Sequence, residues 1–147
     1  MLEKPYAGWT NIKIKNWSDR ASDLSDIHLD LLGALVDSYV TSSYRPACVH
    51  YDAEGWEGII VIDDYFTYII LDDTEENDKK FKFKVITFEV DKDDLAKELI
   101  KDIEENLEEW SLWNVDLYDN KLSQQEENKK IIQNLLNKLK NIIERRG

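Results

Sequence analysis

The chain contains few of the residues on which most catalytic and metal sites depend. Its 147 residues include one cysteine, two histidines and five glycines. The single cysteine, Cys48, excludes an internal disulfide framework and is typical of a reducing cytoplasm. A zinc site needs about four Cys, His or acidic ligands. Neither a Walker A loop nor a GxGxxG motif is present. We therefore expect a cytoplasmic protein with no cofactor, no metal site and no enzymatic activity.

Long apolar runs and an excess of positive charge are missing as well. No segment approaches an uninterrupted run of about 18 apolar residues, the length of a membrane span. The first residues, MLEKPYAGW, lack the basic and then apolar layout of a signal peptide. Asp and Glu number 31 against 19 Lys and Arg, for a net charge of −12. Because clustered Lys and Arg bind phosphate groups, we expect no nucleic acid and no membrane among the partners.

The apolar residues that are present suffice for one hydrophobic core. Hydrophobic residues make up 42% of the chain and aromatic residues 11%, which argues against a disordered chain. The length suits one domain, and no repeat, linker or low-complexity segment divides it. We expect a single domain over residues 1–147.

The negative charge is distributed unevenly. Residues 1–120 carry a net charge of −16, whereas residues 121–147 carry +4. Residues 52–78 contain ten acids and no Lys or Arg, and a lysine cluster at Lys79, Lys80, Lys82 and Lys84 follows at once. Such a block is either a solvated face that keeps the protein soluble or a surface presented to a basic partner.

The first half of the chain predicts a strand and then a helix. Thr10, Ile12 and Ile14 alternate with polar residues, as in a half-buried strand. From about Ser18 to Ser42–Ser43, apolar residues recur at helical steps. This expected stripe consists of Leu24, Ile27, Leu31, Leu35 and Tyr39, and a second, acidic stripe consists of Asp19, Asp23, Asp26, Asp30 and Asp37.

The middle of the chain predicts a meander of strands. We expect strands at 47–51, 59–62, 66–71 and 81–90, joined by a Gly55/Gly58 turn, a turn at 63–65 and an acidic loop at 72–78. The continuous run at 59–62 is typical of a strand covered on both faces.

The last third predicts two helices. Asp91 and Asp94 are suited to a helix start, and the helix is expected to bury Leu95, Leu99, Ile103, Leu107 and Trp110. Its acidic stripe is Glu98, Asp102, Glu105 and Glu109. After a loop or short strand at 113–120, Ser123 and Glu126 form a capping-box pattern before a final helix. The predicted fold is α+β: a mostly antiparallel sheet of three to five strands with helices packed on one side, in the order β-α-β-β-β-α-α.

Two weak chemical patterns need to be weighed. Cys48 and His50 share one face of a predicted strand, but side chains at that spacing rarely converge with a third catalytic group. The acidic segment 72–78 offers oxygen ligands for Ca²⁺, yet it lacks the glycine and the DxDxDG spacing of an EF-hand loop. His28 borders the apolar helical stripe and is expected to be a core-edge residue.

The distinctive feature of the chain is the combination of acids with aromatic residues in the predicted turns. Trp and Tyr are frequent hot spots of interfaces, and surrounding carboxylates attract a basic target. The candidate partner-binding residues are Asp52, Glu54, Trp56, Glu57, Asp63, Asp64, Tyr65, Tyr68, Asp72, Asp73, Glu75 and Glu76.

The segment VHYDAEGWEGIIVIDDYFTYIILDD (Val49 to Asp73), with helices rich in Lys, Asn, Ile and Glu around it, resembles the small acidic immunity proteins of bacterial toxin systems. The likeness is one of overall type. It implies a single-domain α+β protein that binds one basic toxin domain, such as a nuclease, and covers its substrate cleft without catalysis.

Two other functions fit parts of the sequence. The acidic helical stripes repeat at a spacing within reach of that of phosphates, as in a phage- or plasmid-encoded nucleic-acid mimic that inhibits a DNA-binding enzyme. The positively charged final helix has a wide apolar face that would suit a self-associating subunit, a homo-oligomer. Burial of that face inside the same domain explains it more simply, so a homo-oligomer is not favoured.

Overall fold

The computed structural model describes residues 1–41, 45–115 and 121–146, which form six strands and four helices. The strands are β1 (Trp9–Ile14), β2 (Trp17–Ser22), β3 (Ala47–Asp52), β4 (Glu57–Ile62), β5 (Phe66–Asp72) and β6 (Phe83–Glu89). The helices are α1 (Ile27–Val40), α2 (Lys92–Glu105), α3 (Leu107–Ser111) and α4 (Lys121–Arg146). The expected end of the first helix at Ser42–Ser43 and residues 116–120 lie outside the described residues.

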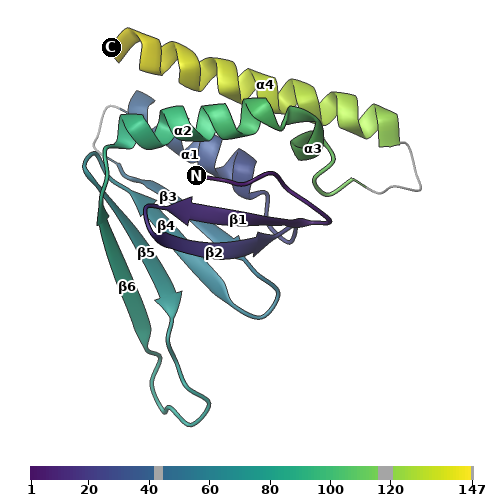
Figure 1. Ribbon diagram of the computed structural model, residues 1–147. Coiled ribbons are helices and arrows are strands. Elements are labelled where there is room, and N and C mark those ends of the chain that lie inside the picture. Colours follow the sequence, from purple (N-terminus) through teal and green to yellow (C-terminus); the bar gives the residue numbers. More distant parts are fainter. Residues whose placement is uncertain (42–44, 116–120, 147) are drawn as a thin grey trace.

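The strands form two antiparallel sheets. β1 pairs with β2, and the other four strands form a meander in the order β3-β4-β5-β6. Figure 1 shows the helices gathered on one side, with the β5–β6 hairpin projecting away from them. The α+β class, the antiparallel sheet and the placement of the helices agree with the prediction from the sequence.

Alternate residues of the four-stranded sheet face two different environments. Val49, Ile60 and Ile69 are paired across three strands and are at most 3% exposed. We call this side, which faces the helices and the β1–β2 hairpin, the inner face. Ile59 and Val61 point to the opposite, outer face and are only partly buried. The expectation that residues 59–62 are covered on both faces is therefore wrong.

The second strand replaces the first third of the predicted helix. Lys15 adopts a left-handed backbone conformation (φ 53°) between the paired residues Ile14 and Trp17, which turns the chain back into β2. Asp19 consequently lies on a strand, and α1 begins only at Ile27. The acidic stripe from Asp19 to Asp37 is therefore not a feature of one helix.

The two later helices follow their predicted patterns only in part. The Asp91 carboxylate accepts a hydrogen bond from the Asp94 backbone N–H at 3.1 Å, so the expected N-cap of α2 is confirmed. The helix ends at Glu105, and Trp110 lies on the short α3, where it is fully buried. Ser123 lies within the first turn of α4 rather than before it, so the predicted capping box is wrong.

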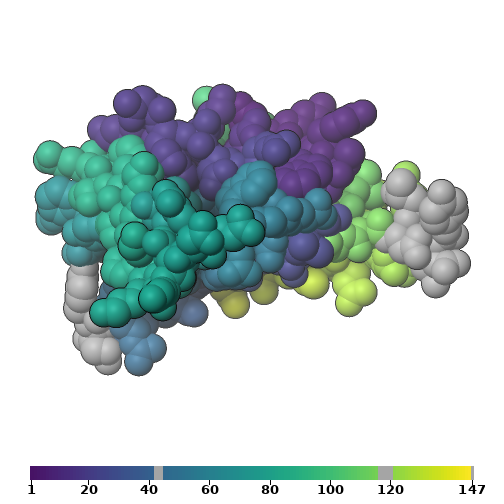
Figure 2. All heavy atoms as spheres, turned by 90° about the horizontal axis from the view of Figure 1, so that it is seen from below, coloured from purple at the N-terminus to yellow at the C-terminus, as the bar shows by residue number. Residues whose placement is uncertain are grey.

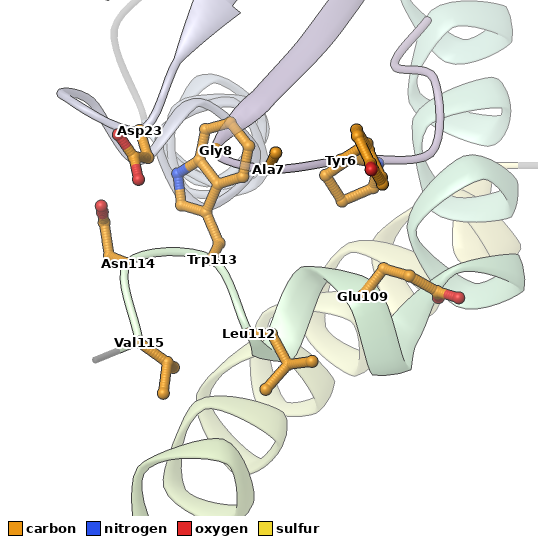
Figure 3. Close-up of a pocket in the computed structure, with 10 residues that line it drawn as sticks. Tyr6, Ala7, Gly8, Asp23, Glu109, Leu112, Trp113, Asn114 and Val115 are labelled. Atoms are coloured by element: carbon orange, nitrogen blue, oxygen red, sulfur yellow. The ribbon is translucent and has the colours of Figure 1, made fainter. Parts of the chain in front are cut away.

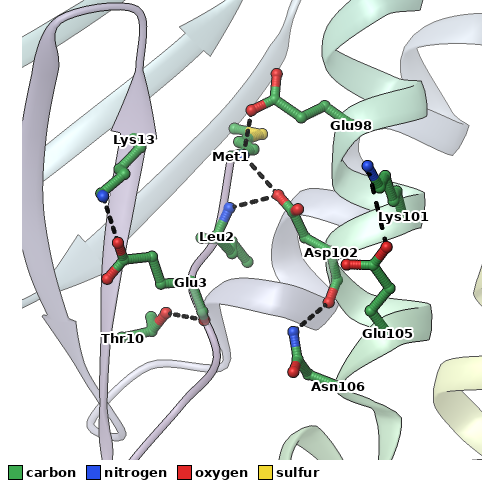
Figure 4. A network of polar contacts seen from close by, with 10 residues as sticks. All are labelled: Met1, Leu2, Glu3, Thr10, Lys13, Glu98, Lys101, Asp102, Glu105 and Asn106. Carbon is green, nitrogen blue, oxygen red and sulfur yellow. Dashed lines mark hydrogen bonds and ion pairs between the residues drawn. The ribbon is translucent and has the colours of Figure 1, made fainter.

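The first residues join the sheets to the helices. The amino group of Met1 donates to the carboxylates of Glu98 and Asp102, each at 2.5 Å, and the Leu2 N–H donates to Asp102 at 3.0 Å (Figure 4). Two members of the acidic stripe predicted on the second helix are thus held by the chain itself. Glu105 and Glu109 pair with Lys101 and Lys4.

Candidate binding surface

The outer face of the four-stranded sheet is apolar, and no element among the described residues packs on it. The strand register places His50, Ile59, Ile70 and Val85 in one row across the sheet. The next row contains Cys48, Val61, Tyr68 and Thr87. Soluble proteins seldom leave contiguous apolar surface uncovered, and larger patches of this kind mark sites of association.

Aromatic residues extend this face toward both ends of the sheet. Phe81 and Phe83 are 69% and 61% exposed, and their ring centroids lie 6.2 Å apart. The rings of Phe66 and Tyr68 are stacked at 6.5 Å. Val85, which is 47% exposed, lies on the same outer face as Phe83.

Several of the candidate acids meet at one end of the sheet, which we call the hairpin end because the β3–β4 and β5–β6 turns lie there. Asp52, Trp56, Glu57 and Asp72 line a hollow of about 430 Å³ together with Gly55 and Thr74. Figure 2 looks onto this end of the molecule. Asp73, Glu75 and Glu76 follow in the same exposed loop, and the exposed Glu54 lies in the β3–β4 turn.

Trp56 is held in place by residues of β2. Its indole N–H donates to the Asp19 carboxylate at 3.1 Å, and Asp19 also accepts from the Tyr51 hydroxyl at 2.5 Å. The Arg20 guanidinium lies over the rings of Trp56 and Trp9, 5.6 and 5.0 Å from their centroids. Trp56 remains 40% exposed. A fixed, partly exposed tryptophan binds a partner at a low cost in side-chain entropy.

The remaining candidate residues lie at the opposite end of the sheet, beside α2. Asp63, Asp64 and Tyr65 form the β4–β5 turn, separated from the hairpin end by the length of a strand, roughly 20 Å at about 3.3 Å per residue. The Asp64 carboxylate binds the Lys92 ammonium at 3.2 Å. Tyr65 is 68% exposed. The structure therefore divides the twelve candidates between two ends, with Tyr68 between them on the outer face.

The structure adds one neighbouring side chain, Glu57, to the Cys48/His50 pattern. Cys48 and His50 do share the outer face, and the His50 imidazole lies 3.6 Å from a Glu57 oxygen. Over residues 1–41, 45–115 and 121–146, no group of three or more His, Cys, Asp and Glu side chains is arranged to hold a metal ion. Within the same residues, no helix is long and apolar enough to cross a membrane.

His28 lies in the core, as its sequence position suggests. Its ring stacks on Trp110 with the centroids 4.6 Å apart, and it is 3% exposed. Burial lowers the pKa of this imidazole to about 3. His28 is therefore neutral at physiological pH, and its Nδ1 atom has no hydrogen-bond partner among the described residues.

A second hollow, of about 340 Å³, lies between the N-terminal segment and the residues after α3 (Figure 3). Tyr6, Gly8, Asp23 and Trp113 are among the residues that line it. The Glu109 carboxylate points away from it and pairs with Lys4 at 3.3 Å. The hollow brings together no set of acid, base and nucleophile.

Searches against protein-family models, curated proteins and solved structures each found no match to this chain. The geometry of the binding surface is therefore the basis for any functional assignment.

Proposed function

We propose that this protein is a non-catalytic binding protein that neutralises a basic protein partner, in the manner of an immunity protein that blocks a bacterial toxin. The observation that carries the proposal is the hairpin end. There a fixed tryptophan and three carboxylates surround one hollow at the border of an apolar sheet face. Such an arrangement combines a central aromatic contact with acids that steer a positively charged target.

The charges around the hollow support this choice. The Asp52 carboxylate accepts a hydrogen bond from the Glu54 N–H, and the Asp72 carboxylate accepts one from the Thr74 N–H, each at 2.9 Å. The Thr74 side chain also bonds to Asp72. Because the backbone N–H donors are neutral, both carboxylates keep their negative charge. The Thr74 N–H lowers the pKa of the Asp72 carboxyl group, so this side chain stays ionised at neutral pH. Basic side chains of a partner would find these carboxylates ready to pair.

The two alternative functions, nucleic-acid mimicry and self-association through the last helix, have less structural support. Mimicry of nucleic acid depended on two helical acidic stripes. The first is divided between β2, the following residues and α1, and the second is partly neutralised by Met1, Lys4 and Lys101. Self-association through the last helix depended on its apolar face. In α4 the centre of that face is buried within the domain, where Ile132, Leu136 and Leu139 are at most 3% exposed, although Ile131 beside it is 45% exposed.

The test uses the full chain as bait in a lysate of its source organism. Wild type is compared with the triple variant Asp52→Lys/Glu57→Lys/Asp72→Lys. The matched control, Glu105→Lys/Glu127→Lys/Glu144→Lys, makes the same change in net charge at exposed helical positions. We expect wild type and the control to retain one basic protein in a one-to-one ratio, and the triple variant to lose it.

The captured protein is then produced alone and together with each variant in a bacterial host. The proposal expects growth arrest that wild type and the control relieve and the triple variant does not. Capture of no basic protein, or equal protection by all three chains, would contradict it.

A further inference from the structure

β6 has a free edge in the four-stranded sheet. β6 is the last strand of the sheet, and no strand of the described residues pairs with its other side (Figure 1). It is seven residues long, and its register with β5 is unbroken from Phe83 to Glu89. A long, regular and unpaired edge strand is a template for another strand.

The hydrogen bonds to β5 show which backbone groups of β6 point outward. The Val90 N–H donates to the Tyr65 oxygen and the Asp73 N–H to the Lys82 oxygen, both at 2.9 Å. Hydrogen-bonded pairs alternate along an antiparallel ladder, so the even-numbered residues of β6 bond to β5. The outward N–H and C=O groups are those of Phe83, Val85, Thr87 and Glu89.

Of the usual devices that protect an edge strand, proline and lysine are absent from these four positions, and Glu89 at the end of β6 is the one charged residue among them. β6 contains no proline, and its lysine, Lys84, is at a position whose backbone groups face β5. Three of the four outward residues are aromatic or β-branched, and Phe83 and Val85 are 61% and 47% exposed. These residue types favour strand pairing.

The charges along β6 favour a second copy of this chain as the strand that pairs with this edge. Its start is flanked by Lys80, Lys82 and Lys84, whereas its end carries Glu89 and is followed by Asp91. A two-fold axis at the middle of the strand would pair two copies antiparallel and set the basic end of each beside the acidic end of the other. A uniformly basic strand would meet the lysines instead. Opposite charges at the two ends make the edge complementary to itself.

We infer that two copies of this chain associate through their β6 edges, to form one continuous eight-stranded antiparallel sheet whose outer apolar faces lie on the same side. This inference does not depend on the partner proposed above, since the residues that line the hairpin-end hollow lie on β3, β4, β5 and the connecting turns rather than on β6. Each dimer would present two such hollows.

The test is the mass of the full chain by analytical ultracentrifugation over a range of concentrations, together with amide exchange by NMR. We expect a species of twice the 17.3 kDa chain mass at high concentration. We also expect the N–H groups of Val85 and Thr87 to become protected from exchange as the dimer forms. Because charge pairing contributes, the dissociation constant should rise at least about threefold between low salt and about 0.5 M salt.

Two variants locate the contact. Thr87→Pro removes an N–H that points away from β5, so the monomer should fold while the dimer is lost. Val85→Lys introduces a charge at the edge and should also give a monomer. Val61→Lys, the matched control on the outer face of β4, should leave the dimer intact.

A chain that stays monomeric at its highest soluble concentration would overturn the inference. So would a dimer that persists in folded Thr87→Pro, or one in which the Val85 and Thr87 amides stay unprotected. Loss of the dimer in Val61→Lys but not in Val85→Lys would place the contact on the sheet face and overturn the edge assignment. Circular dichroism and thermal unfolding establish that each variant is folded.

Discussion

The two faces of the four-stranded sheet are built from alternate residues of the same strands, yet they differ in what covers them. On the inner face, Val49, Ile60 and Ile69 are packed under the helices and the β1–β2 hairpin. On the outer face, the row from His50 to Val85 has no such cover among the described residues. The inner face therefore carries the core packing of the sheet, and the outer face contributes much less to it.

The largest expected effect tests whether the inner and outer side chains of β4 contribute differently to stability, by shortening two neighbouring residues. Ile60→Ala removes a fully buried inner side chain and should lower the free energy of unfolding by about 2–5 kcal/mol, because it leaves a cavity. Val61→Ala, on the half-buried outer side, should cost less than about 1 kcal/mol. Urea denaturation of both variants measures the difference. Equal losses would mean that the outer face is covered in solution, as it would be in an assembly.

The positions of strands β3 to β6 were readable in the sequence, whereas the second strand and the two different faces of β4 were not. These four strands lie within one or two residues of their predicted positions, because each is a short run rich in β-branched and aromatic residues between turn residues. The segment WSDRAS of β2 has one large apolar residue, and its Asp19 falls at helical spacing with Asp23 and Asp26. The local sequence pattern of this segment therefore fits a helix as well as a strand.

The sequence predicted which acidic and aromatic residues are exposed in the turns, but not that they lie at two opposite ends of the sheet. In a meander, successive turns lie at opposite ends, so the separation of Asp63 from Asp72 follows from strand order alone. Sequence reasoning missed this consequence. The contact between Arg20 and Trp56 joins residues 36 positions apart through the packing of β2 on the sheet, for which no local pattern gives a signal.

A second prediction concerns the tight packing of the inner face at the hairpin end. A Cβ atom at Gly58 would collide with the ring of Tyr51, which is fully buried and cannot move aside. Gly58→Ala should therefore lower the free energy of unfolding by about 1–3 kcal/mol. Gly33→Ala is the matched control, since its Cβ would meet no atom within 4 Å and lies on a helix.

That control should raise the free energy of unfolding by about 0.4–1 kcal/mol, because alanine restricts the unfolded chain. Thermal and urea unfolding measure both changes. A stable Gly58→Ala variant would show that the Tyr51 ring is not held against the sheet at Gly58.

A third prediction uses the buried histidine of the helix layer. The pKa of His28 is lowered from 6.5 to about 3 in the folded chain, so between these values the unfolded chain binds a proton that the folded chain does not. Stability is complete above pH 6.5 and falls by about 1.4 kcal/mol per pH unit below it. At pH 5 the loss should be about 2 kcal/mol, and His28→Leu should remove it.

The measurement is urea denaturation at pH 7 and pH 5, compared between wild type and His28→Leu so that the contributions of the carboxylates cancel. His50→Asn is the matched control on the outer face. An unchanged pH dependence in His28→Leu would place a water or another partner at the His28 ring.

The smallest expected effect is a difference in stability between replacing an acid at one end of the sheet, Asp64, and replacing one at the hairpin end, Asp72. The Asp64 carboxylate binds Lys92, which is 6% exposed, lies 4.1 Å from the Tyr39 ring centroid and connects the β4–β5 turn to α1 and α2. Because the Asp64 side chain is 51% exposed, Asp64→Asn should lower the free energy of unfolding by only about 0.5–1 kcal/mol. Asp72→Asn should leave it unchanged, since an amide oxygen also accepts the Thr74 N–H.

A double-mutant cycle of Asp64→Asn with Lys92→Met tests whether the loss belongs to this ion pair, because Met keeps the apolar stem of the lysine. The pairing predicts that Asp64→Asn has no further effect once Lys92 is replaced. If Asp64→Asn is as neutral as Asp72→Asn, the Asp64 carboxylate contributes nothing to the fold and, like Asp72, is available to pair with a basic partner.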